Sequence, residues 1–273
     1  MHKVVGFIGG GQMAEAMIKG LLSRRMFSPN GIFLSEPVNE RRQYLEEYYG
    51  ISTFGNNREV LKHSNILILA VKPQVMDKVL FEIKDDVDVE RHLVITIAAG
   101  LPIKFYESRL PRGSRLIRVM PNTNALIQSS ISAISRGSSA TDEDLEIVEK
   151  IFGAIGEVMM VEEHLMDAVT ALSGSGPAYA ALFIEALIDA GVKCGLPRPV
   201  AEKLTLATIE GTVKLAKATQ RNPYEIKSMV TSPGGTTISA LEVLYTKGFP
   251  GIVIEAVSEA WKRSIEIRKD FED

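Results

Sequence analysis

The chain has 273 residues, more than the ~150 typical of one domain, so two domains are expected. Hydrophobic residues make up 45% and charged residues 24%, as in an ordinary globular protein. The net charge of −3 gives no broad positive field, which argues against nucleic acid as a partner. Cys194 is the only cysteine, so no intrachain disulfide and no thiolate metal cluster can form. A cytoplasmic location is therefore expected.

Neither a targeting segment nor a membrane span is expected. The first strand begins with only His2 and Lys3 before it, which leaves no room for a signal peptide. The apolar stretch 178–192 is interrupted by Glu185 and Asp189 and is shorter than the ~20 residues that cross a bilayer. We interpret this stretch as a helix of the protein core, with no membrane as partner.

The first half of the chain alternates short β-branched runs with helical patterns, which predicts a parallel α/β sheet. The run 66–71 is apolar at every position, as in a strand covered on both faces. Thr141 and the acidic residues after it predict a capped helix over 141–152. The expected strands lie near residues 3–8, 31–35, 66–70, 93–97, 115–119, 130–135 and 157–161.

A glycine-rich turn directly follows the first expected strand and precedes a helix. Gly9 permits a tight turn, Gly11 lets the backbone approach a pyrophosphate, and the small Ala14 lets the helix sit close to the strand. The N–H groups at the start of that helix face the phosphates. The pattern predicts a nicotinamide or flavin nucleotide, although such turns also occur without a ligand.

The end of the second strand carries the residue expected to read the adenosine ribose. A carboxylate at Glu36 accepts hydrogen bonds from the 2′-OH of NADH and repels the 2′-phosphate of NADPH, whereas Arg41 and Arg42 soften that preference. Glu36 equally suits an exposed turn before a proline. The choice between NADH and NADPH therefore stays open.

Three later strand ends lie where open α/β sheets bind ligands. Segments 70–73 and 98–100 are built of small residues that leave room for a flat ring, and Lys72 offers a charge or is simply solvated. The segment 120–124 gathers amide and hydroxyl groups suited to a nicotinamide carboxamide. Asn and Thr after Pro are also common in turns without ligand.

From residue 164 onward the pattern is helical and is broken by Gly and Pro, which predicts an all-helical second domain. We expect a dinucleotide-binding domain over 1–162 and a helical domain over 163–273. The helices expected over 178–191 and 200–218 are apolar around much of their circumference, more than so small a domain can bury. A homodimer through this domain is expected, the alternative being a self-contained bundle.

Two segments of the helical domain combine glycine with hydroxyl residues. Residues 173–179 are expected to open a helix with serine caps and with Pro177 at its first position. Residues 232–237 repeat the pattern before a helix over 238–245, where N–H groups and three hydroxyls suit a small carboxylate. Both segments also fit ordinary capped turns.

The chemistry expected here needs no strong base. His2, His63, His92 and His164 lie outside all these motifs, and no cluster has metal-ligand spacing, so no metal is expected. Oxidation of an alcohol usually requires a His or Lys base. Reduction of a C=N bond needs a hydride donor and a modest proton source, for which threonine or water suffices.

Six segments together, 8–14, 70–73, 98–100, 120–123, 172–179 and 232–237, resemble the pyrroline-5-carboxylate reductase family over the whole chain. The resemblance implies reduction of 1-pyrroline-5-carboxylate to L-proline with NADPH or NADH, the last step of proline biosynthesis. It also implies a Rossmann-type N-terminal domain and an all-α C-terminal dimerisation domain. Family members form dimers that often assemble into decamers.

The same resemblance assigns roles to individual residues. It places the pyrophosphate on Gly9, Gly10, Gly11, Gln12 and Met13. It places the adenosine on Ser35, Glu36 and Asn57, and the nicotinamide beside Ala70, Val71, Lys72, Pro73, Ala98, Ala99, Gly100 and Asn122. It gives the substrate carboxylate to Ser232, Gly235 and Thr236, and the imine nitrogen to Thr237 as the catalytic residue. It also places Gly234 and Ser175 among the substrate-binding residues. Glu36 departs from what NADPH-preferring members are expected to carry.

Two other classes of protein share parts of this pattern. A β-hydroxyacid dehydrogenase would use a helical lysine with an asparagine one turn later, but here Lys203 is followed by Ala207. A non-catalytic dinucleotide-binding regulator would keep the glycine turn without needing the 232–237 segment.

Overall fold

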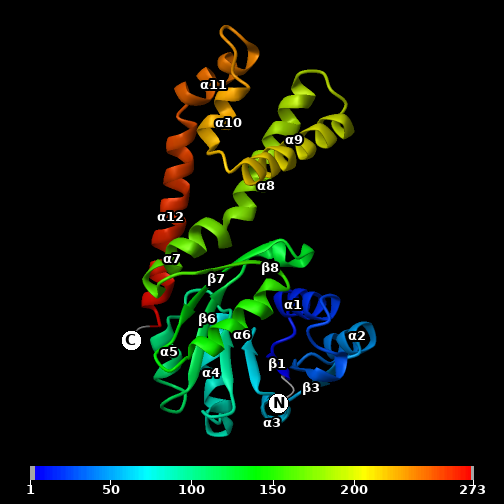
Figure 1. The fold of residues 1–273 in the computed structure, drawn as a ribbon, viewed down its shortest axis with the longest axis vertical. Helices are drawn as coiled ribbons and strands as arrows, with labels where there is room; N and C mark the ends of the chain where they lie inside the picture. The colour runs from blue at the N-terminus through cyan, green and yellow to red at the C-terminus, as the bar shows by residue number, and fades with distance from the viewer. Residues whose placement is uncertain (1–3, 272–273) are drawn as a thin grey trace. The chain divides into compact units, whose positions relative to one another are not determined.

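The computed structural model describes residues 4–271, so His2 and Lys3 lie outside the described residues. The chain divides into two compact units (Figure 1). The first contains the chain up to Ser175 together with the segment from Ala260 onward, and the second is Gly176–Glu259. The domain boundary expected between residues 162 and 163 stays a prediction.

The first unit is built on one eight-stranded sheet in the part of the chain that the structure describes. The order is β3-β2-β1-β4-β5-β6-β7-β8, and all neighbours are parallel except β6 and β7. The strands are β1 Val5–Ile8, β2 Ile32–Ser35, β3 Ser52–Phe54, β4 Ile66–Leu69, β5 Leu93–Thr96, β6 Arg115–Met120, β7 Ser130–Arg136 and β8 Gly156–Met160.

Two features of the sheet differ from the expectation. A wholly parallel sheet was wrong, because only the short 3-10 turn Thr123–Ile127 joins β6 to β7, and a parallel neighbour needs a longer crossover. The edge strand β3 was not predicted, because three residues are too few to show an alternating pattern.

Helices cover both faces of the sheet, as in a doubly wound fold. One core contains side chains of α1, α2 and α6, and the other contains side chains of α3, α4 and α5. Successive strand residues point to opposite faces, so Phe7 joins the first core and Ile8 the second. The helices are α1 Gln12–Ser23, α2 Asn39–Tyr49, α3 Asn57–His63, α4 Pro73–Ile83, α5 Ile103–Glu107 and α6 Asp142–Gly153.

The start of α6 is fixed by local chemistry that the sequence predicted. Thr141 is the N-cap, and its hydroxyl and the Asp144 carboxylate form a reciprocal capping box. Asp144 is buried and also receives the Arg115 guanidinium at 2.9 Å. The acid therefore joins the helix start to the beginning of β6.

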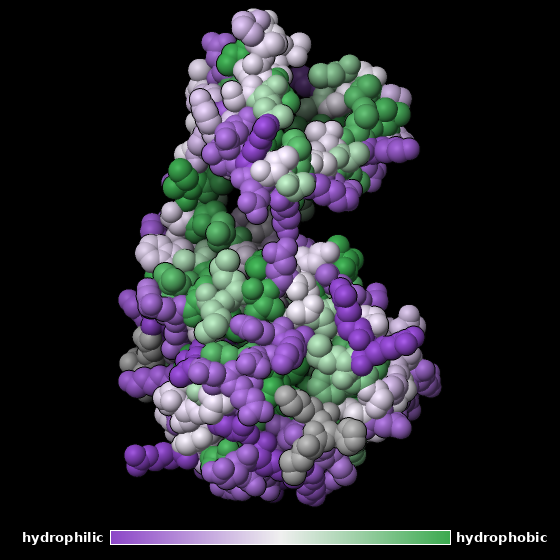
Figure 2. Space-filling view, in the orientation of Figure 1, coloured by the Kyte–Doolittle hydropathy of each residue, from purple (hydrophilic) through white to green (hydrophobic). Residues whose placement is uncertain are grey.

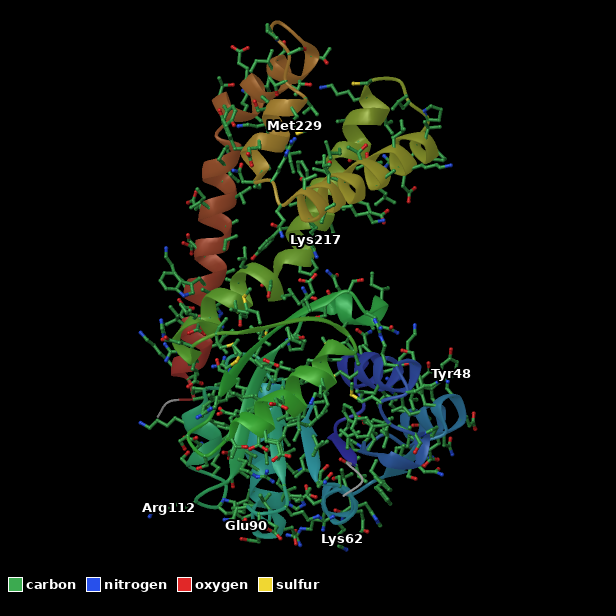
Figure 3. The ribbon with its side chains drawn as sticks, in the orientation of Figure 1. Tyr48, Lys62, Glu90, Arg112, Lys217 and Met229 are labelled. Atoms are coloured by element: carbon green, nitrogen blue, oxygen red, sulfur yellow. The ribbon has the colours of Figure 1, made fainter. Side chains whose placement is uncertain are left out.

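The arrangement of β2 and β4 on either side of β1 creates a topological switch point. Strands β1 to β6 run parallel, so their carboxyl ends share one edge of the sheet. The other edge carries Lys62, at the end of α3, and the loop residues Glu90 and Arg112, which Figure 3 shows at the base of this unit. A ligand crevice is therefore expected at the opposite edge, between β1 and β4.

A long helical stretch leads from the first unit into the second. It contains the 3-10 turn Glu163–Leu165, α7 Met166–Val169, the π turn Thr170–Gly174 and α8 Gly176–Lys193. This helix, Glu163–Lys193, has 31 residues and passes a test for a membrane span by length and composition only, because it extends well beyond the apolar stretch 178–192. The expectation that this stretch is a helix of the core was wrong for the single chain, because only 6% of the most apolar window of the helix is buried.

The expectation of a serine-capped helix start at residues 173–179 was also wrong, because the chain is already helical before Ser173. Pro177 has no N–H to donate to the carbonyl of Ser173, and that carbonyl instead accepts from the Asn122 side chain at 3.2 Å. The Ser175 N–H bonds five residues back to Thr170, at 2.9 Å. The π turn thus accommodates the proline without ending the helix.

The second unit exposes much of its apolar surface. Its helices are α8, α9 Arg198–Thr219, α10 Pro223–Met229, α11 Thr236–Thr246 and the first part of α12 Phe249–Lys269. Only Ala201 and Ile226 are buried between residues 176 and 259. Leu182 is 66% exposed and Ile254 is 67% exposed, and Figure 2 shows hydrophobic side chains on the surface of these helices. Such an extended apolar surface favours association with another chain.

The buried histidine His92 predicts a loss of stability in mild acid. Its Nδ1 accepts from the Asp88 N–H at 2.9 Å, and its Nε2 lies 3.2 Å from the Leu61 carbonyl, an arrangement that suits the neutral ring. Burial lowers the pKa of His92 below its ordinary value. The unfolded chain therefore binds the proton more readily, and the free energy of unfolding should fall as the pH drops below about 6.5.

The slope due to His92 is limited to about 1.4 kcal/mol per pH unit, the value for one proton. Urea unfolding of the wild type and of His92→Gln between pH 5 and pH 8, at one protein concentration, measures it. If the free energy of unfolding of His92→Gln depends on pH as steeply as that of the wild type, His92 is not the cause of the acid destabilisation.

Candidate functional site

A cleft of about 540 Å³ lies at the switch point of the sheet in the first unit. Glycine turns and strand ends form one wall, and helix α4 forms the other. Nine of the residues predicted for the cofactor line this cleft: Gly9, Gly10, Gly11, Ser35, Glu36, Asn57, Ala70, Val71 and Lys72.

The glycine turn brings the backbone of β1 and β4 into close contact. Gly9 has a φ of +102°, and a Cβ built on it would lie 2.7 Å from the Ala70 carbonyl oxygen. Gly11 is the N-cap of α1 without a side-chain cap, and a Cβ there would meet nothing within 4 Å. The N–H groups of the first turn of α1 therefore face open space, as binding of a pyrophosphate requires. Gln12 and Met13 form that first turn.

Glu36 binds the glycine turn directly. Its Oε2 accepts from the Gly10 N–H at 2.9 Å, and its Oε1 accepts from the Val38 N–H at 3.1 Å. The other polar backbone group of Gly10, its carbonyl, accepts from the Arg41 Nε at 2.7 Å. The backbone of Gly10 is thus held from both sides by residues that follow β2.

Both arginines beside Glu36 already have partners. Arg41 pairs with Glu15 at 2.5 Å, and Arg42 donates to the carbonyls of Glu36 and Pro37 at 2.7 and 3.1 Å. Burial raises the pKa of Glu15, but the hydrogen bonds from Arg41 and two tyrosines outweigh it, and the net pKa is lowered. Glu15 therefore stays charged and retains Arg41. The expected softening of the nucleotide preference by these arginines requires them to leave these partners.

A polar chain crosses the cleft at the end of β2. Ser35 Oγ donates to Asn57 Oδ1 at 2.6 Å, and Asn57 Nδ2 donates to Glu82 at 2.9 Å. Glu82 was not predicted as a site residue. It lies on α4, whose residues 75, 78, 79 and 82 all line the cleft. Their helical spacing was visible in the sequence, but only the register of α4 shows that this face is turned to the cleft.

Other predicted nicotinamide residues lie outside the residues that line this cleft. Pro73 is the first residue of α4, directly after the N-cap Lys72. Residues 98–100 follow β5, and Gly100 has a φ of +79°. Asn122 follows β6 and is buried, and its amide bonds Ser130 at 3.1 Å and the Ser173 carbonyl at 3.2 Å. The Asn122 side chain is thus engaged in holding the fold together.

The predicted substrate segment lies in the second unit, at the start of α11. Gly234 has a φ of +65°, and Gly235 is the N-cap without a side-chain cap. Gly235 N donates to the Ser232 carbonyl at 3.1 Å, and a Cβ on Gly235 would lie 2.3 Å from the Ser232 hydroxyl. Thr236 and Thr237 are the first two residues of α11. The segment therefore offers N–H groups beside hydroxyls, a combination that binds carboxylates. Ser175 belongs to the first unit.

No group of three His, Cys, Asp or Glu side chains is placed to hold a metal ion among residues 4–271.

Comparison with known proteins identifies the protein family of this chain. Residues 163–267 match the family model described as pyrroline-5-carboxylate reductase dimerisation, and residues 4–100 match one described as NADP oxidoreductase, coenzyme F420-dependent. A pyrroline-5-carboxylate reductase of Synechocystis is 45% identical, with 97% of this chain and 98% of the relative aligned. The chain belongs to the pyrroline-5-carboxylate reductase family.

Less similar members of the family also align with this chain over nearly its whole length, in sequence and in structure. The Escherichia coli pyrroline-5-carboxylate reductase is 37% identical, with 98% of this chain and 100% of the relative aligned. A Coxiella burnetii pyrroline-5-carboxylate reductase structure has a TM-score of 0.91 at 32% identity, covering 98% of this chain and 99% of the other. A Plasmodium falciparum pyrroline carboxylate reductase with NADP bound has a TM-score of 0.89 at 32% identity, covering 98% of both chains. The expected resemblance and fold class are confirmed.

The contact at Gly9 predicts the effect of adding one methyl group. Gly9→Ala should weaken NAD(P)H binding by at least about tenfold, because the Cβ must displace the Ala70 carbonyl as well as strain the backbone. Calorimetric titration of the cofactor measures the effect.

Gly113→Ala is the matched control for Gly9→Ala. Gly113 has a φ of +91°, but a Cβ there meets nothing within 4 Å. The control should lose some stability and keep its cofactor affinity. Equal affinity losses in the two variants would mean that backbone strain alone explains the result.

Proposed function

We propose that this chain reduces the C=N bond of 1-pyrroline-5-carboxylate to give L-proline, with NADPH or NADH as the hydride donor. The reaction is the last step of proline biosynthesis. The observation that carries the proposal is the presence, in a member of this family, of both an uncapped glycine turn at a Rossmann switch point and a glycine-threonine helix start. The first suits a dinucleotide and the second suits a small carboxylate.

The residues of the first unit fit the cofactor. The open N–H groups after Gly11 would hold the pyrophosphate, and Ser35, Glu36 and Asn57 would hold the adenosine ribose. The segments 70–73 and 98–100 follow neighbouring parallel strands and would flank the nicotinamide, with Asn122 close to it. When bound, the cofactor supplies the hydride.

The helix start in the second unit would bind the substrate. Ser232, Gly235 and Thr236 would hold the carboxylate, and the family resemblance also assigns Gly234 and Ser175 to the substrate. The Thr237 hydroxyl would bond the imine nitrogen and orient it, holding the proton that the nitrogen receives. An imine is basic enough near neutrality for a hydroxyl to suffice, so the residues act mainly by positioning.

The two rival functions lack comparable support. Lys203 on α9 has Ala207 one turn later, which offers no amide to assist alcohol oxidation. A regulator that only bound a dinucleotide would have no use for a carboxylate-binding helix start.

We further propose a cytoplasmic homodimer. The apolar helices of the second unit lie within the match to a dimerisation domain, which supports pairing through them. The single cysteine Cys194 suits a reducing compartment. Assembly of such dimers into decamers stays a prediction from the family resemblance, as does the absence of nucleic acid and membrane partners.

Removing the hydroxyl of Thr237 tests the chemical step. Thr237→Ala should lower kcat by about tenfold or more, because a hydrogen bond made mainly in the transition state contributes about 1 to 3 kcal/mol. The Kd for NADPH should stay within about twofold of wild type, while Thr237→Ser should recover most of kcat. Thr246→Ala, at the far end of α11, is the control. Unchanged turnover in Thr237→Ala would dismiss the role of Thr237.

Neutralising Glu36 tests the nucleotide preference. Glu36→Gln should raise the ratio of kcat/KM for NADPH to that for NADH by about tenfold, because a carboxylate repels the 2′-phosphate. Steady-state rates with both cofactors give the ratio. Glu40→Gln removes the same charge from an exposed position of α2 and should leave the ratio unchanged. A ratio that moves equally in both variants would show that net charge alone is responsible.

A further inference from the structure

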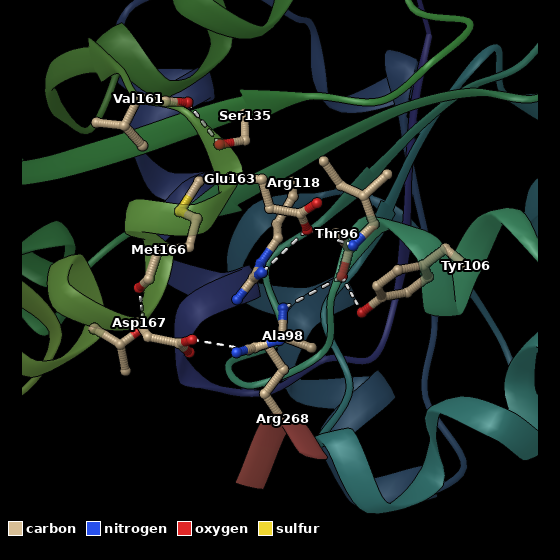
Figure 4. Close-up of polar contacts among 12 residues, drawn as sticks. Thr96, Ala98, Tyr106, Arg118, Ser135, Val161, Glu163, Met166, Asp167 and Arg268 are labelled. Carbon is tan, nitrogen blue, oxygen red and sulfur yellow. Dashed lines mark hydrogen bonds and ion pairs between the residues drawn. The ribbon is translucent and has the colours of Figure 1, made fainter. Parts of the chain in front are cut away.

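The final turns of α12 are anchored in the first unit by a shared carboxylate. Asp167 of α7 accepts from the Ser264 hydroxyl at 2.8 Å. It also accepts from the Arg268 Nε at 2.9 Å (Figure 4). Asp167 and Ser264 are each only 5% exposed. Because each carboxylate oxygen has its own partner, the bonds restrain the rotation of α12 as well as its position.

Aromatic packing adds a second restraint just after α12. Phe271 contacts Phe105 edge to face, with 5.8 Å between ring centroids, and packs against the core that contains α4 and α5. We call Ser264, Arg268 and Phe271 the α12 anchor. The anchor lies on both sides of Ile267 along the chain, so it sets where the Ile267 side chain lies.

Ile267 lies against the loop that follows β5. A Cβ built on Gly100 would lie 2.7 Å from Ile267 Cγ2 and 3.6 Å from its Cβ. Among the residues that the structure describes, no other atom beyond the chain neighbours comes within 4 Å of that position. Gly100 has a φ of +79°, a conformation that its lack of a side chain permits but does not enforce.

The rest of the loop is held from inside the unit. Thr96 Oγ1 donates to the Tyr106 hydroxyl at 2.5 Å and accepts from the Ala98 N–H at 3.4 Å (Figure 4). Glu163 accepts from the Ile103 N–H at 2.5 Å and from buried Arg118 at 3.2 Å. These bonds restrain the two ends of the loop, which leaves Gly100 as the part restrained by Ile267.

We propose that Ile267 is a positioning residue for the nicotinamide half of the cofactor, acting through the Gly100 turn. The inference rests on the proposed function in one respect, namely that residues 98–100 lie beside the nicotinamide. A glycine turn held by folding does not have to be ordered by the ligand, and the ring then meets a wall of fixed shape. Loss of the Ile267 contact should therefore affect the nicotinamide half and spare the adenosine half.

The test compares ligands with and without the nicotinamide, on the full-length enzyme. Titration calorimetry with NADPH and with 2′-phospho-ADP-ribose gives the two affinities, and steady-state kinetics gives kcat. In Ile267→Ala, NADPH should bind about tenfold more weakly and kcat should fall, whereas 2′-phospho-ADP-ribose should bind as in the wild type. Ile267→Val keeps a branched side chain against Gly100 and should recover most of both losses.

Ile147→Ala is the matched control. Ile147 is a half-buried isoleucine of α6 that packs on the core of the same unit. Ile147→Ala should lower the melting temperature and leave the affinities for NADPH and 2′-phospho-ADP-ribose unchanged. Equal weakening of both ligands in Ile267→Ala, or no weakening of NADPH, would overturn the positioning role.

Ala99→Val separates this inference from the proposed function. The added methyl groups change the surface of the loop directly, without any change in α12. Binding of NADPH should therefore weaken, and binding of 2′-phospho-ADP-ribose should not. If neither ligand responds to Ala99→Val, the placement of the nicotinamide beside residues 98–100 is wrong. If the affinity for NADPH falls in Ala99→Val but not in Ile267→Ala, only the positioning role of Ile267 is wrong.

Discussion

The near contact between Gly9 and the Ala70 carbonyl is the constraint on which the dinucleotide cleft depends. Strands β1 and β4 are adjacent and parallel, so the chain must turn sharply after Ile8 to leave the crevice between their ends open. A side chain at residue 9 would close that turn against β4. Because the turn is tight, α1 begins at once and its uncapped N–H groups point into the cleft.

Charged side chains, not apolar packing, hold this glycine turn in place. Gly10 has no side chain to bury, and its N–H and carbonyl are instead bonded by Glu36 and Arg41. Arg41 is in turn oriented by Glu15 of α1, so the helix after the turn and the strand beside it determine one another's position. The shape of this glycine turn thus depends on Glu36, between β2 and α2, and on charged side chains in the first turns of α1 and α2.

Local features could be predicted from the sequence, whereas long-range ones could not. The turn at Gly9 and the capping box at Thr141 depend on a few consecutive residues, and the structure has both where they were expected. The contact between Gly100 and Ile267 joins residues 167 positions apart, and no periodicity reveals it. The π turn was not predicted, because the carbonyl that Pro177 leaves without its helical donor is bonded by a distant amide, that of Asn122.

Imine reduction explains why the proposed substrate segment 232–237 carries hydroxyl groups and no titratable side chain. An imine nitrogen near neutrality takes up a proton readily, so a poised base of shifted pKa has little to add. The barrier depends more on holding two planar rings at the right distance and angle, a task for rigid backbone. Glycine turns let backbone approach a ring closely, but they are flexible unless neighbours restrain them. The bonds of Asp167, Glu163 and Thr96 restrain the segments next to such a turn, so under our proposal these charged and polar groups assist the chemistry by making backbone rigid.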